Sequence, residues 1–265
     1  MRIIPSGRSL AVPSQMLTVV KDGLVLNVDA GDTNSYPLTG VTWSDRSTAA
    51  TNFTLTNGAT YSISPFVGLT AAHIQFDGVD DHALNAANTA QQALSNQSDF
   101  SIDVWFRLTS PTTAARCIVS NGTASAGAAN RGIGFVLSVG STNTTVRMTI
   151  TSDTSVNIVA AYFEPSSNLT GTAFVHLVGT YDYDDGTGFS AYEFYKNGNF
   201  VTNGTGVNKP ASMGNSSNPI YIARRPSGTL QYAPIQLVSL KLYNKILSAT
   251  EVAQNYNALR GRFGL

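Results

Sequence analysis

Residues 100–108 (FSIDVWFRL) place the tightest constraint on what this chain can fold into. The apolar side chains occupy alternate positions: Phe100, Ile102, Val104, Phe106 and Leu108. This period of two predicts a β-strand with one apolar face. Trp105 interrupts the otherwise polar side, so the second face of the strand is expected to be covered as well. A sheet that is covered on both faces indicates two packed sheets.

Further strand patterns recur every ten to fifteen residues. They are predicted at residues 23–29, 73–77, 145–151, 174–182, 219–225 and 235–243. Residues 191–201 (AYEFYKNGNFV) predict a hairpin, because Asn197-Gly198 readily takes the positive φ angles of a tight primed turn. The apolar phase of the last strand slips near Val238, which predicts a β-bulge. This spacing is typical of an antiparallel sandwich or jelly roll.

The chain finishes on one predicted helix near residues 249–259. Ser248 and Glu251 have the S-x-x-E spacing of a capping box, in which each side chain satisfies a free amide of the first turn. Apolar residues then recur at helical spacing. Gly261 is the expected stop of the helix.

The first 21 residues are expected to be an arm outside the sandwich. Proline, glycine and serine punctuate this stretch, and no amphipathic period holds in it. Residues 22–265 show no internal repeat and no change of composition, so one domain is expected there. The predicted fold class is all-β: a two-sheet antiparallel jelly roll or β-sandwich with one short C-terminal helix.

Composition excludes several classes of partner. Charged residues make up 12% of the 265 residues, and 16 basic side chains balance 16 acidic ones. No run of lysine or arginine could follow a phosphate backbone, so no nucleic acid is expected to bind. No apolar stretch is long enough to span a bilayer, so no membrane is expected either. The first residues lack the apolar core of a secretory signal peptide.

Seven segments follow one another in an order and spacing that suggest a family. They are residues 29–47, 76–81 (FDGVDD), 100–107, 176–182 (HLVGTYD), 195–201 (YKNGNFV), 220–225 (IYIARR) and 240–256. Together they resemble the concanavalin A-like lectin/glucanase superfamily, in its laminin G-like branch. The pairing of DAGDTNSYP and TWSD with the terminal LSATEVAQNYNALRGRFGL further resembles structural proteins of tailed bacteriophages, especially those of cyanobacterial hosts. The resemblance implies two curved sheets closed by the terminal strand and helix.

The superfamily includes hydrolases, lectins and adhesion modules, so the residues must decide between them. A retaining glucanase needs two carboxylates about 5 Å apart, and the superfamily's hydrolases carry them on one strand as E-x-D-x-x-E or close variants. The chain has three glutamates, Glu164, Glu193 and Glu251, and none has an acidic neighbour two positions away. We therefore expect no enzymatic activity.

Three oxygen-rich loops are candidates for calcium, which prefers clustered carboxylates and carbonyls. The strongest candidate is the loop that carries Asp182, Asp184 and Asp185. The other two sets are Asp29, Asp32 and Asn34, and Asp77, Asp80 and Asp81. A solvated acidic turn is the alternative interpretation, and the FDG of the third set first predicts turn chemistry.

A sugar-binding site would combine exposed aromatic rings with amides and carboxylates. Aromatic residues in or near predicted loops are Tyr36, Trp43, Tyr162, Phe163, Tyr183 and Tyr232. Trp43 is expected to anchor the core. The carbohydrate-binding candidates are Tyr183, Tyr162 and Tyr232, of which Tyr183 lies inside the acidic loop.

These observations leave three hypotheses for function. The first is a non-catalytic virion structural protein of a tailed phage, on the capsid surface or tail, with lectin-like glycan binding. Such a protein would be made in the host cytoplasm without a signal peptide and would contact other virion proteins, copies of itself through the arm, and a host-surface glycan. The second is a soluble carbohydrate-binding module that recognises a host polysaccharide. The third, least favoured, is a glycoside hydrolase.

Overall fold

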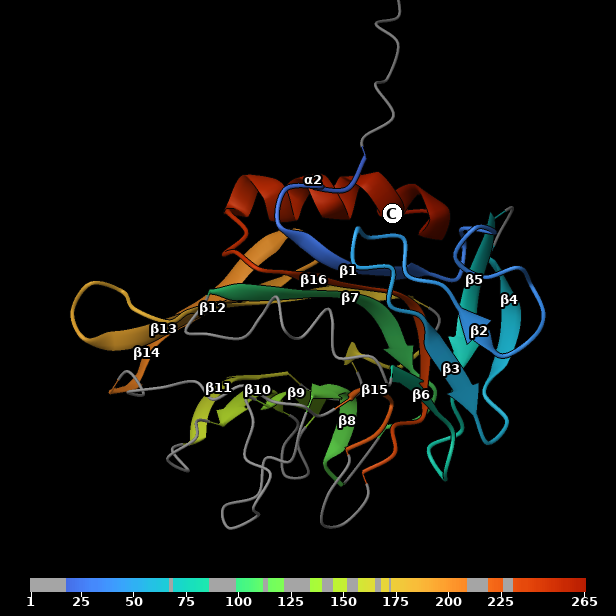
Figure 1. Cartoon of the computed structure of the whole chain (residues 1–265), viewed down its shortest axis with the longest axis horizontal. Helices are drawn as coiled ribbons and strands as arrows, with labels where there is room; N and C mark the ends of the chain where they lie inside the picture. Colours follow the sequence, from blue (N-terminus) through green and yellow to red (C-terminus); the bar gives the residue numbers. More distant parts are fainter. Residues whose placement is uncertain are drawn as a thin grey trace, which may run out of the picture.

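Strand β7 (Phe100–Leu108) is buried on both faces, as its sequence predicts. Of its nine residues, Arg107 is the one that is partly exposed. One face packs into the core between two stacked sheets, and the other lies beneath helix α2 (Ala249–Leu259) (Figure 1). The prediction of two packed sheets is confirmed. The polar face of β7 is covered by helix α2, whereas its apolar face packs toward the other sheet.

The structure is a computed structural model that describes residues 18–66, 69–85, 99–111, 114–121, 134–139, 145–151, 157–164, 168–171, 173–208, 219–225 and 231–265. It contains two eight-stranded sheets whose strand pairs are antiparallel. The predicted fold class is therefore confirmed. The helices in these ranges are too short or too polar to cross a bilayer.

The first sheet has the order β14-β13-β12-β7-β16-β5-β4, and β1 pairs with β16 next to β5. Its other strands are β1 (Leu24–Asp29), β4 (Thr60–Phe66), β5 (Leu69–Gln75), β12 (Val175–Asp182), β13 (Phe189–Lys196), β14 (Asn199–Asn208) and β16 (Ile235–Tyr243). The long strands β7 and β16 lie side by side, and both are almost fully buried. They form the centre against which both the core and α2 pack.

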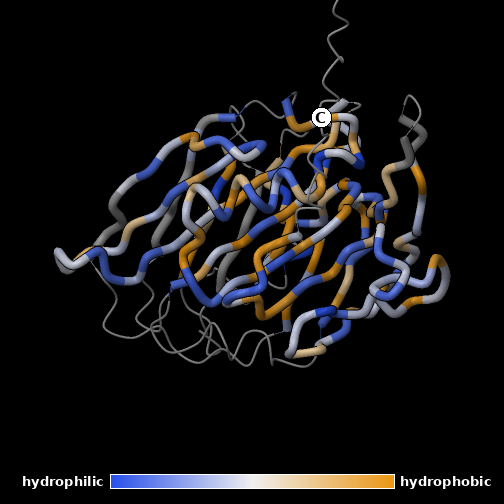
Figure 2. Tube along the Cα trace, turned by 90° about the horizontal axis from the view of Figure 1, so that it is seen from above, coloured by the Kyte–Doolittle hydropathy of each residue, from blue (hydrophilic) through white to orange (hydrophobic). Residues whose placement is uncertain are grey.

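The second sheet has the order β11-β10-β9-β8-β15-β6-β3-β2. Its strands are β2 (Thr42–Trp43), β3 (Phe53–Thr56), β6 (His82–Asn85), β8 (Arg116–Asn121), β9 (Gly134–Val139), β10 (Thr145–Thr151), β11 (Asn157–Phe163) and β15 (Ile220–Ile222). Apolar residues of both sheets meet in one core. In Figure 2 the hydrophobic stretches, in orange, run mainly through the middle of the molecule. Trp43 is fully buried there, as the sequence predicts.

Two local predictions are confirmed. The turn between β13 and β14 has φ of 51° at Asn197 and 77° at Gly198, which are the positive angles of a primed turn. The pairing of β16 with β7 shifts register between Leu237 and Ser239, so the bulge lies at Val238. This bulge places Val238 in the apolar cluster on the helix side of the sheet rather than in the core.

Helix α2 begins at the predicted cap and ends at Leu259, as predicted, but the turn that follows it differs from the prediction. The Ser248 side chain accepts from the Glu251 amide, and the Glu251 side chain accepts from the Ser248 amide. The expected stop at Gly261 is wrong, because the chain continues as a 3₁₀ turn, η2 (Arg260–Phe263), and reverses at Gly264 with φ of 71°. Packing explains the difference: Phe263 is buried and stacks on Trp105, with ring centroids 4.4 Å apart.

A buried polar network joins α2 to the sheet. The fully buried carboxylate of Asp103 lies 3.1 Å from His176 Nε2 and 3.5 Å from Lys241 Nζ, and it accepts a hydrogen bond of 2.8 Å from Asn255 Nδ2. Burial alone would raise the pKa of Asp103, but Lys241, His176 and Asn255 outweigh it and hold that pKa well below its usual range. One aspartate thus fixes side chains from β12, β16 and α2.

The same network reaches the start of the described chain. Asn255 Oδ1 accepts from the amide of Val20 at 2.8 Å, and the Tyr243 hydroxyl donates to the Val20 carbonyl at 3.2 Å. The Val20 side chain is buried against the helix cluster. Residues 18–20, which the expected arm included, therefore lie against α2. Residues 1–17 of that arm lie outside the described residues.

We expect Lys241→Met to lower the free energy of unfolding by about 3–5 kcal/mol, because it leaves Asp103 buried without its ammonium partner. The double variant Asp103→Leu/Lys241→Met should be less destabilised, since no unpaired charge remains. Urea unfolding measures both. The control is Lys21→Met, at an exposed lysine. A loss for Lys241→Met no larger than that of the control would contradict the assignment.

Candidate functional site

Two of the three tyrosines that were predicted to bind sugar are buried in the structure. Tyr162 is 7% exposed and Tyr183 is 5% exposed, and both belong to the core between the sheets. The ring of Tyr162 packs against Phe194, with centroids 5.1 Å apart. Their assignment as carbohydrate-binding residues is therefore wrong, because neither ring has a face free for a ligand. The side chain of Phe163 lies outside what the structure describes.

The predicted calcium loop does not form a cluster. Asp182, Asp184 and Asp185 each accept a hydrogen bond from the amide two residues further on, at 3.0, 3.2 and 2.8 Å respectively. Each carboxylate thus caps its own local turn. Among the described residues, the three do not bring their oxygens within ligand distance of one another. The alternative interpretation, a solvated acidic turn, describes this loop.

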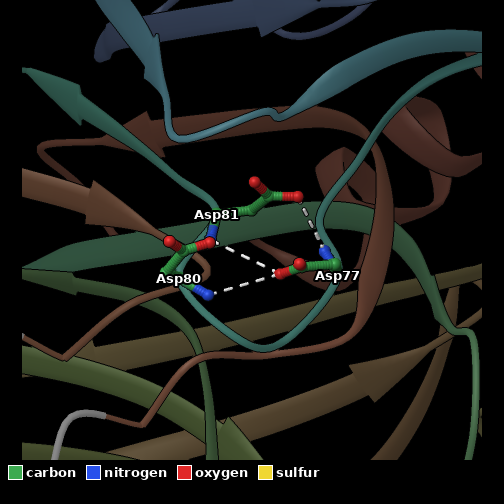
Figure 3. A group of neighbouring side chains, drawn as sticks. All are labelled: Asp77, Asp80 and Asp81. Carbon is green, nitrogen blue, oxygen red and sulfur yellow. Dashed lines mark hydrogen bonds between the residues drawn. The ribbon is translucent and has the colours of Figure 1, made fainter.

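The carboxylates that do converge are those of Asp77, Asp80 and Asp81. One oxygen from each lies within 4.8 Å of the others (Figure 3). Asp77 Oδ1 accepts from the amide of Val79 at 2.7 Å, which lowers the pKa of Asp77. Asp81 Oδ2 accepts from the amide of Asp77 at 3.0 Å, while burial raises the pKa of Asp81. These bonds close the tight turn that the FDG motif predicts.

This acidic turn leads directly into a cluster of basic and aromatic side chains, which we call the rim site. It consists of His82, Tyr221, Arg224 and Tyr232. The Arg224 guanidinium carbon lies 5.1 Å from the ring centroid of Tyr221 and 5.9 Å from that of Tyr232. Its Nη1 is 3.2 Å from His82 Nε2. Tyr232 is the one predicted sugar-binding residue in the cluster.

Strand alternation directs two members of the rim site outward. Tyr221 on β15 lies between Ile220 and Ile222, which point into the core, so the tyrosine faces the opposite side of the second sheet. On β6 the neighbour Ala83 is in the core, which turns His82 to the same outer side. Strands β15 and β6 are paired. The two side chains therefore meet, with ring centroids 6.1 Å apart.

An unusual backbone conformation places the other two members. Ala223 has φ of 63°, a left-handed angle that a residue with a Cβ rarely adopts. Its amide donates to the Ile118 carbonyl at 2.8 Å, and its carbonyl accepts from the Ala233 amide at 3.0 Å. These bonds hold the turn that carries Arg224 beside the segment that carries Tyr232. Rare backbone conformations that are held by surrounding contacts are common at functional sites.

Hydrogen bonding defines the protonation of the rim site. Nδ1 of His82 lies 3.0 Å from the Asp80 carbonyl and donates to it, so Nε2 is left to accept from Arg224. Burial lowers the pKa of His82, and the Arg224 charge lowers it further. The imidazole is therefore neutral at physiological pH. Arg224 Nε has no hydrogen-bond partner among the described residues.

The rim site offers what a sugar ring needs. Tyr221 and Tyr232 are both partly exposed, and their hydroxyls make no hydrogen bond with a described residue. A pyranose can stack its C–H face on such a ring while its hydroxyls bond to polar groups at the edge. Sequence reasoning found Tyr232 alone. Tyr221 could have been found, because a tyrosine between two core isoleucines on a strand must face outward.

All three glutamates of the chain have a structural partner. Glu164 accepts from Lys196 Nζ at 2.9 Å. Glu193 accepts from the Tyr195 hydroxyl. Glu251 belongs to the helix cap and pairs with Lys245 at 2.8 Å. Each of these carboxylates thus stabilises the fold locally.

Comparison with known families agrees with this architecture. Residues 77–253 match the sequence profile of the laminin G-like domains described as the concanavalin A-like lectin/glucanases superfamily. The chain belongs to this superfamily. The matched region begins at the acidic turn and includes the whole rim site. No curated protein sequence matches the chain.

Solved structures share the fold of this superfamily member at low sequence identity. The binding domain of botulinum neurotoxin DC in complex with SialylT has 15% identity and a TM-score of 0.60, over 90% of this chain and 52% of that one. The binding domain of Paraclostridial Mosquitocidal Protein 1 has 17% identity and a TM-score of 0.62, over 90% and 52%. Trypanosoma rangeli sialidase with the inhibitor DANA has 15% identity and a TM-score of 0.53, over 90% and 33%. The chain thus spans about half of each toxin domain.

The electrostatics of the rim site can be tested by NMR titration of the histidine rings. We expect His82 to titrate below the ordinary value of 6.5. Arg224→Met should raise the pKa of His82, because it removes the neighbouring cation, but burial should keep it below 6.5. His73 is an internal control, since its lowered pKa comes from burial and from Arg107. An unchanged His82, or an equal change at His73, would contradict the contact.

Proposed function

We propose that this concanavalin A-like protein is a non-catalytic glycan-binding protein and that the rim site is its binding surface. The observation that carries the proposal is the placement of Arg224 between two partly exposed tyrosines, next to a neutral histidine. Ring faces for stacking lie beside fixed hydrogen-bond donors and acceptors. That combination suits a hydroxyl-rich ligand better than an apolar one.

Two further findings support binding without catalysis. A toxin binding domain, about half of which this chain covers with the same fold, was solved in complex with SialylT. The three glutamates of this chain have partners in the helix cap, in an ion pair and on a neighbouring tyrosine. A hydrolase would need two carboxylates set toward the scissile bond. The similar sialidase aligns over 33% of its own length and does not decide the question.

The binding proposal predicts loss of affinity in rim-site variants. Tyr232→Ala and Tyr221→Ala should each weaken binding to oligosaccharides displayed on a glycan array by about 3- to 10-fold, because each removes one stacking face. The matched control is Phe200→Ala, since Phe200 is an exposed aromatic residue, 52% exposed, on the distant edge strand β14. Thermal unfolding checks that all three variants are folded.

Two outcomes would contradict the proposal. Unchanged affinity in both tyrosine variants would exclude the rim site, and an equal loss in Phe200→Ala would show that the effect is not specific to it. Cleavage of the displayed oligosaccharide by the purified protein would refute the non-catalytic part.

A second candidate function is structural, in the particle of a tailed phage. It is favoured by the resemblance of residues 29–45 and 247–265 to phage structural proteins and by the apolar content of the first 17 residues. That stretch contains Ile3, Ile4, Leu10, Val12, Met16 and Leu17. Apolar side chains on an arm favour a partner surface over water. Thr18 and Val20 lie against α2, on the opposite side of the sandwich from the second sheet (Figure 1). Attachment through the arm would leave the rim site facing outward.

The structural role predicts that the arm can be removed without harm to the domain. Deletion of residues 1–16 keeps the contacts of Thr18 and Val20 with α2, so the thermal midpoint should stay within a few degrees. The truncated protein should no longer assemble onto its particle, as antibody labelling in the electron microscope would show. Deletion of residues 1–20 is the contrasting variant, because it also removes Val20 and should melt lower. A lower midpoint for the shorter deletion, or normal assembly, would refute the attachment role.

A further inference from the structure

We infer a second ligand site, separate from the rim site, beneath the C-terminal end of α2. A groove of about 510 Å³ opens there between β1, the segment at residues 18–21 and the helix end. Its size lies in the range of small-molecule sites, which is about 300–1,000 Å³. The ligand class that its lining fits is a neutral, hydroxyl-rich molecule of one or two sugar rings.

The main observation is that the carboxamide of Asn27 lies in the wall of this groove without a hydrogen bond to the described protein. Asn27 lines the groove from β1 and is 9% exposed. Its backbone amide donates to Asp45 and its carbonyl accepts from Arg46, but its side chain makes no hydrogen bond with a described residue. Because Asn27 lines the groove, its carboxamide is open to it, and the donor and acceptor groups of this side chain are available to a ligand.

The charges around Asn27 are largely compensated within the protein. Asp29 accepts from Arg262 Nη1 through both oxygens, at 2.7 and 2.8 Å. Lys241 donates to the Ser239 hydroxyl at 3.1 Å and faces Asp103. The remaining charged side chains of the lining are one of each sign, Lys21 and Asp32. The groove therefore offers donors and acceptors in balance, which favours a neutral ligand over an ionic one.

The rest of the lining is aliphatic. Val19, Ala258 and Leu259 contribute apolar surface, and the lining contains no aromatic ring. A molecule with C–H faces and many hydroxyls matches this mixture, since hydroxyls both donate and accept. Recognition here would use hydrogen bonds and aliphatic contact, whereas the rim site would use stacking.

Two substitutions test the groove with little risk to the fold. Asn27→Ala removes a side chain that has no partner in the described protein, so the thermal midpoint should be unchanged or higher. Gly261→Phe adds bulk to the wall, where a Cβ would meet no atom within 4 Å. The control is Asn257→Ala on the exposed side of α2. Tyr232→Ala separates this site from the rim site.

The probes are glucose, galactose, mannose, lactose, maltose and sucrose, with glucuronate as an acidic comparison. Binding is followed in the full-length protein through the side-chain amide resonance of Asn27 and through ligand-observed NMR. We expect at least one neutral probe to shift that resonance and to bind about tenfold more weakly to Asn27→Ala and to Gly261→Phe. Binding in this groove should be unchanged in Asn257→Ala and Tyr232→Ala.

Several results would overturn the inference. They are no shift with any neutral sugar, a shift with glucuronate alone, or unchanged affinity in both groove variants. A lower thermal midpoint for Asn27→Ala would also overturn it, because the amide would then have a structural partner. If the rim-site variants did not change binding on the glycan array, the results for the groove would not be affected. The two sites are therefore tested independently.

Discussion

The arrangement of this protein depends on one buried carboxylate. Asp103 is fully enclosed on the helix-facing side of β7, where desolvation would make an isolated charge very costly. An ammonium, an imidazole and a carboxamide from three other elements surround it. Helix α2 is therefore more than an apolar cover, since its Asn255 is part of the shell that makes the charge tolerable. The stack of Trp105 between His176 and Phe263 then fills the space around that shell.

This arrangement separates the two sides of the sandwich. The centre of sheet one, formed by β7 and β16, is occupied on both faces, by the core and by α2, so the side chains there are committed to structure. On sheet two, the outer face carries His82 and Tyr221, and no described helix covers it. The members of the rim site lie where the backbone leaves regular geometry, next to the acidic turn before β6 and the left-handed Ala223.

Features that depend on a few adjacent residues can be predicted from the sequence, whereas contacts between segments that are distant in the sequence cannot. Strand alternation, the Asn197-Gly198 turn, the bulge at Val238 and the Ser248–Glu251 cap each depend on a few adjacent residues, and each is confirmed. The rim site depends on pairing between segments 142 residues apart, as in the contact of Arg224 with His82. The reversal of the chain at Gly264, instead of the predicted Gly261, was missed for the same reason, because it depends on the stacking of Phe263 on the distant Trp105.

The site residues show the same limit. Tyr162 and Tyr183 lie near loops in sequence, but strand direction and the core bury their rings. Carboxylate spacing likewise ranked the loop of Asp182 above that of Asp77, although ligand geometry depends on which way each side chain turns. At Asp182, local amides turn the oxygens apart. At Asp77, a tight turn brings them together.

The side chain of Asn255 connects Asp103 to the segment at Val20, because it bonds to both. Its Nδ2 donates to Asp103, so its Oδ1 must face the amide of Val20. The charge on Asp103 thereby orients the Asn255 carboxamide, so that its oxygen faces the N-terminal segment. Because its folded pKa is held well below the usual value, the carboxylate contributes stability that is present above the ordinary aspartate pKa and lost as the pH falls through the folded value. Across the neutral range the charge persists. The segment that enters from residue 18 is therefore held against α2, beside the groove that Asn27 and Lys241 line.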